Sequence, residues 1–249
     1  MEEKRNSRPL HFLGTGSAFN TVLGCNSAWF RCGSELFVID QGGDVLPKMV
    51  AQNLFAGVSR VHVFLTHMHC DHVGGLANMI LYVNSRILVH EPDKMRVYSP
   101  DPNMDPFLNM QGTGPSNYCL FDDREGVIET SAGALAYSFV QTKHADLFDP
   151  FNFSLEFAWR GENPFRIFYS SDAKIWQPRL AEPQKYDAIY HETTQRETSS
   201  VHLPYQDLKK AVRNYSAADR AKVVLMHLDN DFDCEQAKLD GFSIAENET

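Results

Sequence analysis

The sequence predicts an α/β protein in which two packed β-sheets are covered by helices. Short apolar runs bounded by turn residues recur along the chain, and amphipathic segments with helical spacing alternate with them. In both halves strands come first, and strands mixed with helices follow. No repeat or linker divides the 249 residues, so we expect a single domain over residues 1–249. This length is ample to bury a continuous core.

Strands are predicted in the first half wherever a short apolar run is bounded by Gly, Asn or Ser. These runs cover residues 10–14, 27–32, 36–40, 61–65 and 86–90. Residues 44–55 and 73–84 carry apolar positions at helical spacing, and they are predicted to be helices. Residues 98–117 are rich in Pro, Gly, Asn and Asp, which predicts a long loop. Such a loop either covers a site, joins a second subunit or is a surface excursion without a role.

The second half repeats this pattern with longer strands. Its predicted strands are residues 135–142, 151–159, 164–171, 187–191 and 222–227. Residues 173–180 and 203–215 are predicted helices on either side of the fourth of these strands.

The charge and the cysteine content favour an intracellular protein with a small ligand. The chain has 23 Lys and Arg against 32 Asp and Glu, a formal charge of -9, which argues against a broad nucleic-acid surface. The charged N-terminus lacks the apolar stretch of a signal peptide, and no run is long enough to cross a membrane. Five cysteines without a CxxC pattern are typical of a reduced, cytoplasmic protein.

The strongest functional signal is the run THMHCDH at residues 66–72. It follows an apolar strand and precedes a Gly-Gly helix start. Alternation at a strand end places His67 and His69 on one side, and the turn that follows brings Asp71 and His72 to a second position nearby. Imidazole and carboxylate groups are ligands for zinc and other divalent ions. The run therefore predicts two ligand pairs that hold two divalent ions close together.

This HxHxDH run at a strand end resembles the signature of the metallo-β-lactamase superfamily. The segment FLGTGSA at residues 12–18 resembles the start of the RNase Z branch. The resemblance covers Phe12 to His227 and implies a four-layer αββα fold. It also implies a His, an Asp and a His at three later strand ends, and the matches here are His144, Asp172 and His227.

The resemblance also implies how the seven ligands divide between two ions. One ion is held by His67, His69 and His144, the other by Asp71, His72 and His227, and Asp172 bridges them. Zinc suits a His-rich site best, while manganese and iron stay open. Two such ions can activate a water and offset negative charge on a phosphodiester. Asp71 keeps one oxygen free when it acts as a ligand, so it is predicted to orient the attacking hydroxide.

Two further motifs favour a phosphodiester as the substrate. Asp172 stands where many β-lactamases have Cys, which disfavours antibiotic hydrolysis. The HxHxDH run lacks the Glu of the di-iron branch, which disfavours oxygen reduction. YHETT (190–194) and VHLPY (201–205) resemble the HEAT and HST elements of RNase Z, although neither matches fully. The resemblance implies that Glu192 and His202 pass a proton to the leaving group. The alternative is a surface Glu and a His that begins a helix.

The interval between His144 and Asp172 separates this chain from RNase Z itself. Its 28 positions are filled by two predicted strands and a turn, so there is no room for a tRNA-binding arm. A small phosphodiester, most simply a 3′,5′-cyclic mononucleotide, is therefore the expected substrate, and no large nucleic acid is expected as a partner. Armless relatives include phage and bacterial cyclic nucleotide phosphodiesterases of the anti-Pycsar type, which erase a nucleotide immune signal.

Three other functions stay open from the sequence, as do the oligomeric state and the residues that contact the base. The alternatives are a tRNA 3′-end endonuclease with its arm elsewhere, a thioester or other ester hydrolase on the same metals, and a nucleotide-binding sponge that does not cleave its ligand. The resemblance also implies a homodimer. Three aromatic residues of the predicted loop either stack on a base or pack within the protein: Tyr98, Phe107 and Tyr118.

Overall fold

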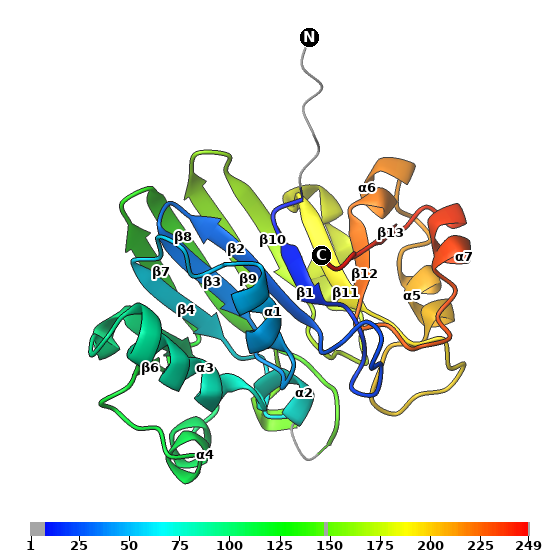
Figure 1. The fold of residues 1–249 in the computed structure, drawn as a ribbon. Helices are drawn as coiled ribbons and strands as arrows, with labels where there is room; N and C mark the ends of the chain where they lie inside the picture. The colour runs from blue at the N-terminus through cyan, green and yellow to red at the C-terminus, as the bar shows by residue number, and fades with distance from the viewer. Residues whose placement is uncertain (1–7, 147–148, 249) are drawn as a thin grey trace.

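Two mixed β-sheets pack face to face, and helices cover their outer sides (Figure 1). The computed structural model describes residues 8–146 and 149–248. The predicted architecture of two packed sheets flanked by helices is thus confirmed. The first seven residues, where no signal peptide is expected, lie outside the described part.

The first sheet has six strands in the order β1-β2-β3-β4-β5-β6. Its first three strands are antiparallel, and β3 to β6 run parallel. The strands are β1 (His11–Gly14), β2 (Ser27–Cys32), β3 (Glu35–Ile39), β4 (Arg60–Phe64), β5 (Met95–Tyr98) and β6 (Cys119–Phe121).

The second sheet has seven strands in the order β13-β12-β11-β10-β9-β8-β7. Strands β7 to β10 pair antiparallel, whereas β10 to β13 run parallel. The strands are β7 (Glu125–Thr130), β8 (Gly133–Gln141), β9 (Phe153–Gly161), β10 (Phe165–Tyr169), β11 (Ala188–Glu192), β12 (Val223–Met226) and β13 (Ser243–Ile244).

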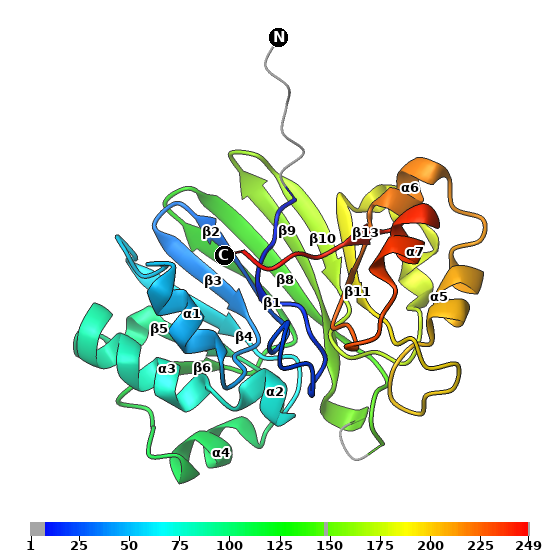
Figure 2. The same cartoon turned by 45° about the vertical axis from the view of Figure 1, so that its right-hand side comes forward.

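Helices cover the outer face of each sheet (Figure 2). The first sheet is covered by α1 (Val45–Ala51), α3 (Leu76–Tyr82) and α4 (Met104–Met110), and the parallel part of the second by α5 (Tyr205–Ala211), α6 (Ala217–Ala221) and α7 (Cys234–Leu239). The short helix α2 (Cys70–Val73) follows β4. No helix among the described residues is long and apolar enough to cross a membrane.

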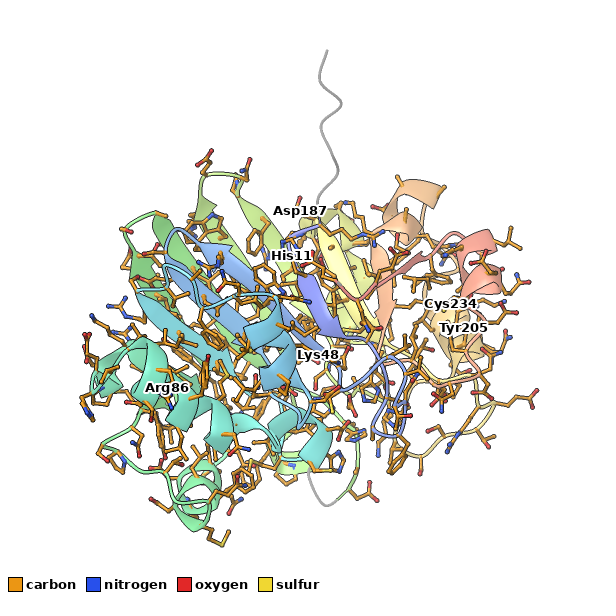
Figure 3. All side chains as sticks on the ribbon, in the orientation of Figure 1. His11, Lys48, Arg86, Asp187, Tyr205 and Cys234 are labelled. Carbon is orange, nitrogen blue, oxygen red and sulfur yellow. The ribbon has the colours of Figure 1, made fainter. Side chains whose placement is uncertain are left out.

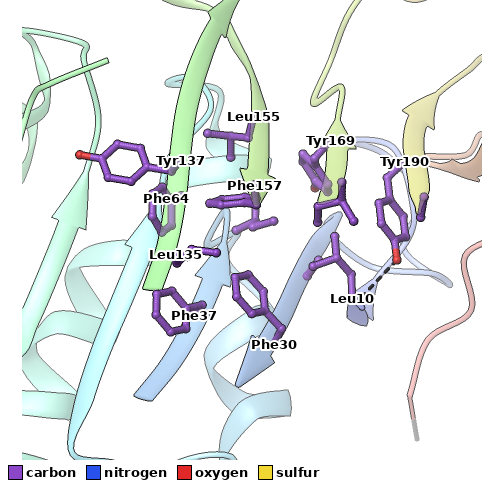
Figure 4. Packing of buried hydrophobic residues seen from close by; sticks show 14 of the residues in the cluster. Leu10, Phe30, Phe37, Phe64, Leu135, Tyr137, Leu155, Phe157, Tyr169 and Tyr190 are labelled. Carbon is purple, nitrogen blue, oxygen red and sulfur yellow. Dashed lines mark hydrogen bonds between the residues drawn. The ribbon is translucent and has the colours of Figure 1, made fainter. Parts of the chain in front are cut away.

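The core between the sheets is rich in aromatic side chains, and side chains fill the layers (Figures 3 and 4). Phe157 lies at its centre, with ring centroids 4.9 Å from Phe64 and 5.7 Å from Phe30 in edge-on contacts. Strand β3 is buried along its whole length, because Phe37 and Ile39 face this core while Leu36 and Val38 face the helices. Burial on both faces is expected of a strand with neighbours on both sides and helices above it.

Phe157→Ala is expected to destabilise the protein strongly. The ring is fully buried, and its removal leaves a cavity between two sheets that are held by other contacts. Such truncations cost about 3–5 kcal/mol. Urea unfolding followed by fluorescence would measure the change, with Val127→Ala, at a 61% exposed position of the same sheet, as the control. Equal stability of the two variants would contradict the assignment of Phe157 to the core.

Three predictions of secondary structure are wrong. Residues 86–90 are not a strand, because Val83–Ile87 continues α3 as a π-helical turn and the next strand is β5. A short apolar run does not distinguish a buried strand from a buried helix end. Residues 98–117 are not an open loop, since Met104 and Leu108, one helical turn apart, are fully buried and anchor α4.

Residues 173–180 are also not a helix, apart from the 3₁₀ turn Pro178–Ala181. The backbone N–H groups at the start of this segment are used elsewhere: Ala173 donates to Glu192 Oε1, and Lys174 donates to the carbonyl of Lys143. Pro178 lacks an N–H and disfavours helical backbone before it. Contacts to the site described next therefore override the helical pattern.

Candidate metal centre

All seven residues that the sequence singles out as ligands lie together beyond the carboxyl ends of strands. The segment with His67 and His69 follows β4, and His144 follows β8. Asp172 lies three residues after β10, and His227 comes directly after β12. Strands that run in the same direction end at the same edge, so chemistry-bearing residues far apart in the chain converge there.

The first donor group contains three imidazoles and one carboxylate. Ligand atoms of His67, His69, His144 and Asp172 all lie within 4.8 Å of one another. His69 Nδ1 is 2.9 Å from His67 Nε2 and 3.1 Å from His144 Nε2. Asp172 Oδ2 is 3.5 Å from His144 Nε2 and 4.0 Å from His67 Nε2.

The second donor group contains two imidazoles and two carboxylates. Its members, Asp71, His72, Asp172 and His227, again lie within 4.8 Å of one another through one ligand atom each. Asp71 Oδ2 is 3.3 Å from His72 Nε2 and 3.5 Å from His227 Nε2. Asp172 Oδ1 is 3.3 Å from both of these nitrogens.

Asp172 belongs to both groups and presents a different oxygen to each. Its Oδ2 faces His67 and His144, while its Oδ1 faces His72 and His227. The carboxylate is 2% exposed, and burial alone would raise its pKa. The His227 and His72 rings outweigh burial and hold the pKa of Asp172 well below its usual range. An ionised carboxylate between two donor sets is placed to bridge two cations.

The buried atoms of the second group fit a cation rather than mutual hydrogen bonds. His72 Nε2, His227 Nε2 and Asp172 Oδ1 have no hydrogen-bond partner among the described residues, although each is buried. Unsatisfied buried polar atoms are costly, so a ligand is expected to engage them. Tetrahedral zinc with Zn–N distances of about 2.0–2.1 Å separates its ligand atoms by about 3.3 Å, close to the spacing seen here.

The first group presents neutral imidazoles, the form that binds metals. Burial is the main cause: it lowers the pKa of His67 well below its usual value and the pKa of His144 to about 4. The His144 ring is oriented by a hydrogen bond of 2.7 Å between its Nδ1 and the Val201 carbonyl. Metal-binding histidines commonly use their second ring nitrogen in this way.

A buried network that the sequence did not reveal orients the other rings. Asp40 Oδ2 accepts a hydrogen bond from His72 Nδ1 at 2.8 Å, and both Asp40 oxygens accept from the Thr66 hydroxyl. Ser171 donates from the opposite sheet to the Thr66 hydroxyl, which lies 3.1 Å from His67 Nδ1. Asp40 and Ser171 both have positive φ, at 61° and 54°, which is uncommon and strained for such residues.

Asp40→Ala is expected to weaken metal binding without removing a ligand. It frees His72 to rotate, and loss of such an outer contact typically reduces metal affinity or activity about 10- to 100-fold. Competition with a chromophoric chelator would measure the affinity, with Asp207→Ala, an exposed acid that pairs with Lys210, as the control. Unchanged affinity in Asp40→Ala would show that this network does not position the ligands.

Glu192 and His202 lie beside the second donor group. Glu192 is fully buried at the end of β11, and its Oε1 accepts hydrogen bonds from the Ala173 and Leu203 N–H groups. Its Oε2 lies 3.1 Å from His202 Nδ1, an ion-pair contact without hydrogen-bond alignment. Ligand atoms of Glu192, His202 and His227 lie within 4.8 Å of one another. The surface alternative for Glu192 is therefore wrong.

The carboxylate sets the protonation of this histidine. Burial alone would lower the pKa of His202, but the Glu192 charge outweighs it and raises that pKa to about 9. The side chain of His202 keeps 23% of its surface exposed. A protonated imidazole that is held next to the metal donors and open to solvent is suited to give up a proton and take it back.

The aromatic residues of the predicted loop pack within the protein. Tyr98 and Tyr118 are each 2% exposed, and Phe107 packs against the core beneath the helices. Tyr118 also donates its hydroxyl hydrogen bond to Asp105 at 2.6 Å. A role in base stacking is thereby excluded for the two tyrosines in this structure.

Comparison with known proteins places the chain in a family. The model of the anti-Pycsar protein Apyc1 family matches residues 9–248. The chain belongs to this family. A similar relative is the anti-Pycsar protein Apyc1 of Bacillus phage 010DV004, which is 25% identical over 248 residues that cover 90% of each chain.

Solved structures show the same fold for this Apyc1-family chain. The metallo-beta-lactamase fold protein YhfI from Bacillus subtilis aligns with a TM-score of 0.73 at 15% identity, over 96% of this chain and 97% of that one. The short form of human tRNase Z aligns with a TM-score of 0.67 at 16% identity, with the same coverage. The metallo-β-lactamase fold expected from the sequence is confirmed. Family membership and the donor groups identify the chain as a metal-dependent hydrolase.

Proposed function

We propose that this hydrolase is a dinuclear phosphodiesterase that opens a 3′,5′-cyclic mononucleotide to a nucleoside monophosphate and so removes a nucleotide immune signal. The observation that carries the proposal is the Glu192–His202 pair beside two donor groups that share Asp172. Membership of the anti-Pycsar protein Apyc1 family supports the biological role. Two Zn²⁺ ions suit the His-rich donors best, and Mn²⁺ and iron are the other candidates.

The donor groups provide the ligands for the two ions. His67, His69 and His144 would hold one ion, Asp71, His72 and His227 the other, and Asp172 would serve both. When bound, such a pair supplies an activated water and positive charge opposite a phosphate. Asp71 uses Oδ2 toward the two imidazoles, which leaves its other oxygen to accept a hydrogen bond from the attacking group.

His202 completes the reaction by protonating the leaving group. When the bond between phosphorus and the ribose oxygen breaks, that oxygen takes the proton of the imidazolium, which Glu192 stabilises. The neutral ring then regains a proton from solvent through its exposed surface. A ribose oxygen is a poor leaving group without a proton, so this step is the main contribution of the pair.

The short connection between His144 and Asp172 supports a small substrate over tRNA. Between His144 and Asp172 the described chain forms a 3₁₀ turn and the tight hairpin of β9 and β10. The formal charge of -9 adds no attraction for an extended phosphate backbone. A small diester reaches the donors without such a surface.

The proposal is tested by incubating the zinc- or manganese-loaded protein with the 3′,5′-cyclic forms of AMP, GMP, CMP and UMP, a precursor tRNA and a thioester. We expect linear monophosphate from at least one cyclic nucleotide. Cleavage of the tRNA or the thioester alone would replace the proposal with one of those activities. Tight nucleotide binding without any product would indicate a sequestering protein instead.

A further inference from the structure

The loop of residues 15–24 lies between two ligand segments of the second donor group. At one end Ser17 N donates to the carbonyl of Leu228, the residue after His227, at 3.0 Å. At the other end, Cys25 packs closely on Gly42, and Gly42 packs on the backbone of Asp71. A Cβ atom added to Gly42 would lie only 2.7 Å from Cys25 Sγ and 2.3 Å from the Asp71 carbonyl oxygen. The loop thus joins the backbones that carry His227 and Asp71, beside α2 in Figure 2.

Asn20 holds this loop in one conformation. Its side chain is 4% exposed, and its Nδ2 donates to the Leu228 carbonyl at 2.9 Å. Its Oδ1 accepts from the N–H groups of Val22 and Leu23. A loop whose polar groups are used in this way presents its tip in a defined place relative to the donor groups.

Phe19, next to Asn20, is 88% exposed at the tip of this ordered loop. Across residues 8–146 and 149–248, every other Phe, Tyr and Trp is at least partly buried. Burial of a phenylalanine side chain is favourable, so an ordered loop that leaves this ring in solvent forgoes that free energy until a ligand covers the ring.

We propose that Phe19 is the platform on which the base of the bound nucleotide stacks, an inference that rests on the proposed function. The donor groups fix the phosphate, and the base is the one planar, apolar part of a cyclic nucleotide. An aromatic ring accepts any base through its π-face. Phe19 is the neighbour of Asn20, whose side chain bonds to the carbonyl of Leu228, and Leu228 follows His227 directly. This contact ties the loop that displays Phe19 to the His227 side of the centre.

The test compares Phe19→Ala and Phe19→Trp with the wild-type protein, all loaded with zinc. Substrates are the preferred cyclic nucleotide and the 3′,5′-cyclic phosphate of 1-deoxyribose, which lacks a base. We expect Phe19→Ala to raise KM for the nucleotide about tenfold, because the stacking of the base on the ring is lost, and to leave kcat unchanged. Phe19→Trp should retain the wild-type KM, and turnover of the baseless substrate should be equal in all three proteins.

Leu239→Ala, which removes another exposed side chain at the end of α7, is the matched control and should change nothing. An unchanged nucleotide KM in Phe19→Ala would overturn the platform while leaving the phosphodiesterase intact. Light scattering adds a second check. If Phe19→Ala separates a dimer while the KM stays at the wild-type value, the ring contacts a second copy of the chain and the stacking proposal is overturned. Absence of nucleotide turnover by the wild-type protein would instead defeat the proposed function.

Discussion

Asp172→Ala is expected to abolish turnover and to remove bound metal. Its two oxygens face different donor groups, and among the described residues no other side chain belongs to both groups. Loss of the charge should reduce kcat by at least about a thousandfold, given the several kcal/mol that a metal centre contributes to stabilising developing charge. Metal content measured by mass spectrometry should fall below two ions per chain. Asp71→Ala and His69→Ala, each in one group only, should also inactivate the protein and lose metal.

The control for these variants is Asp122→Ala, which removes an exposed carboxylate between β6 and β7. It should keep two ions and full activity. Circular dichroism would establish that Asp172→Ala is folded. A folded Asp172→Ala protein with wild-type turnover would refute the assignment of the centre.

His202→Ala is expected to separate proton transfer from metal binding. The ring is outside both main donor groups, so the variant should keep its metal. Turnover of a cyclic nucleotide should fall about 100- to 10,000-fold, the usual contribution of general acid catalysis. A diester with a p-nitrophenolate leaving group needs little protonation and should be cleaved at a nearly unchanged rate.

Variants of Glu192 test whether its carboxylate acts through the imidazole of His202. Because the carboxylate acts through the imidazole, the double variant Glu192→Ala/His202→Ala should be no slower than His202→Ala alone. Glu192→Gln, which keeps the hydrogen bonds from Ala173 and Leu203 but not the charge, should show the loss of proton transfer without loss of structure. Equal losses with both kinds of leaving group would contradict a role in protonation.

The sequence revealed the candidate centre well because each ligand follows a short apolar strand. The run 66–72 carries four donors within seven residues, and His144, Asp172 and His227 each stand just beyond a strand. Their convergence then depends only on the strands ending at one edge. Whether all seven bind metal stays a prediction.

Asp40 shows what the sequence left hidden. It follows β3 directly and stands two residues before Gly42-Gly43, so an acid at another strand end was a usable signal. Its role depends on a long-range contact with His72 and on strained backbone, which no local pattern encodes.

Three of the elements that were not predicted, β7, α6 and α7, have weak apolar patterns for physical reasons. In β7 only Ile128 is buried, because the strand lies at the sheet edge, so alternation is barely visible. Helix α6 buries no residue and α7 buries only Ala237, so neither shows an apolar stripe. The helix predicted over residues 173–180 is absent for the opposite reason. The segment has a helical pattern, but the hydrogen bonds of Ala173 with Glu192 and of Lys174 with Lys143 override it.

Metal titration of cyclic nucleotide hydrolysis tests the central claim most directly. The protein is stripped with a chelator and reloaded with zinc while linear monophosphate is measured. We predict no turnover without metal and a rise that reaches its plateau at two ions per chain, as expected for two donor groups that share Asp172. Turnover by the metal-free protein, or no hydrolysis of any cyclic nucleotide at full loading, would contradict the account.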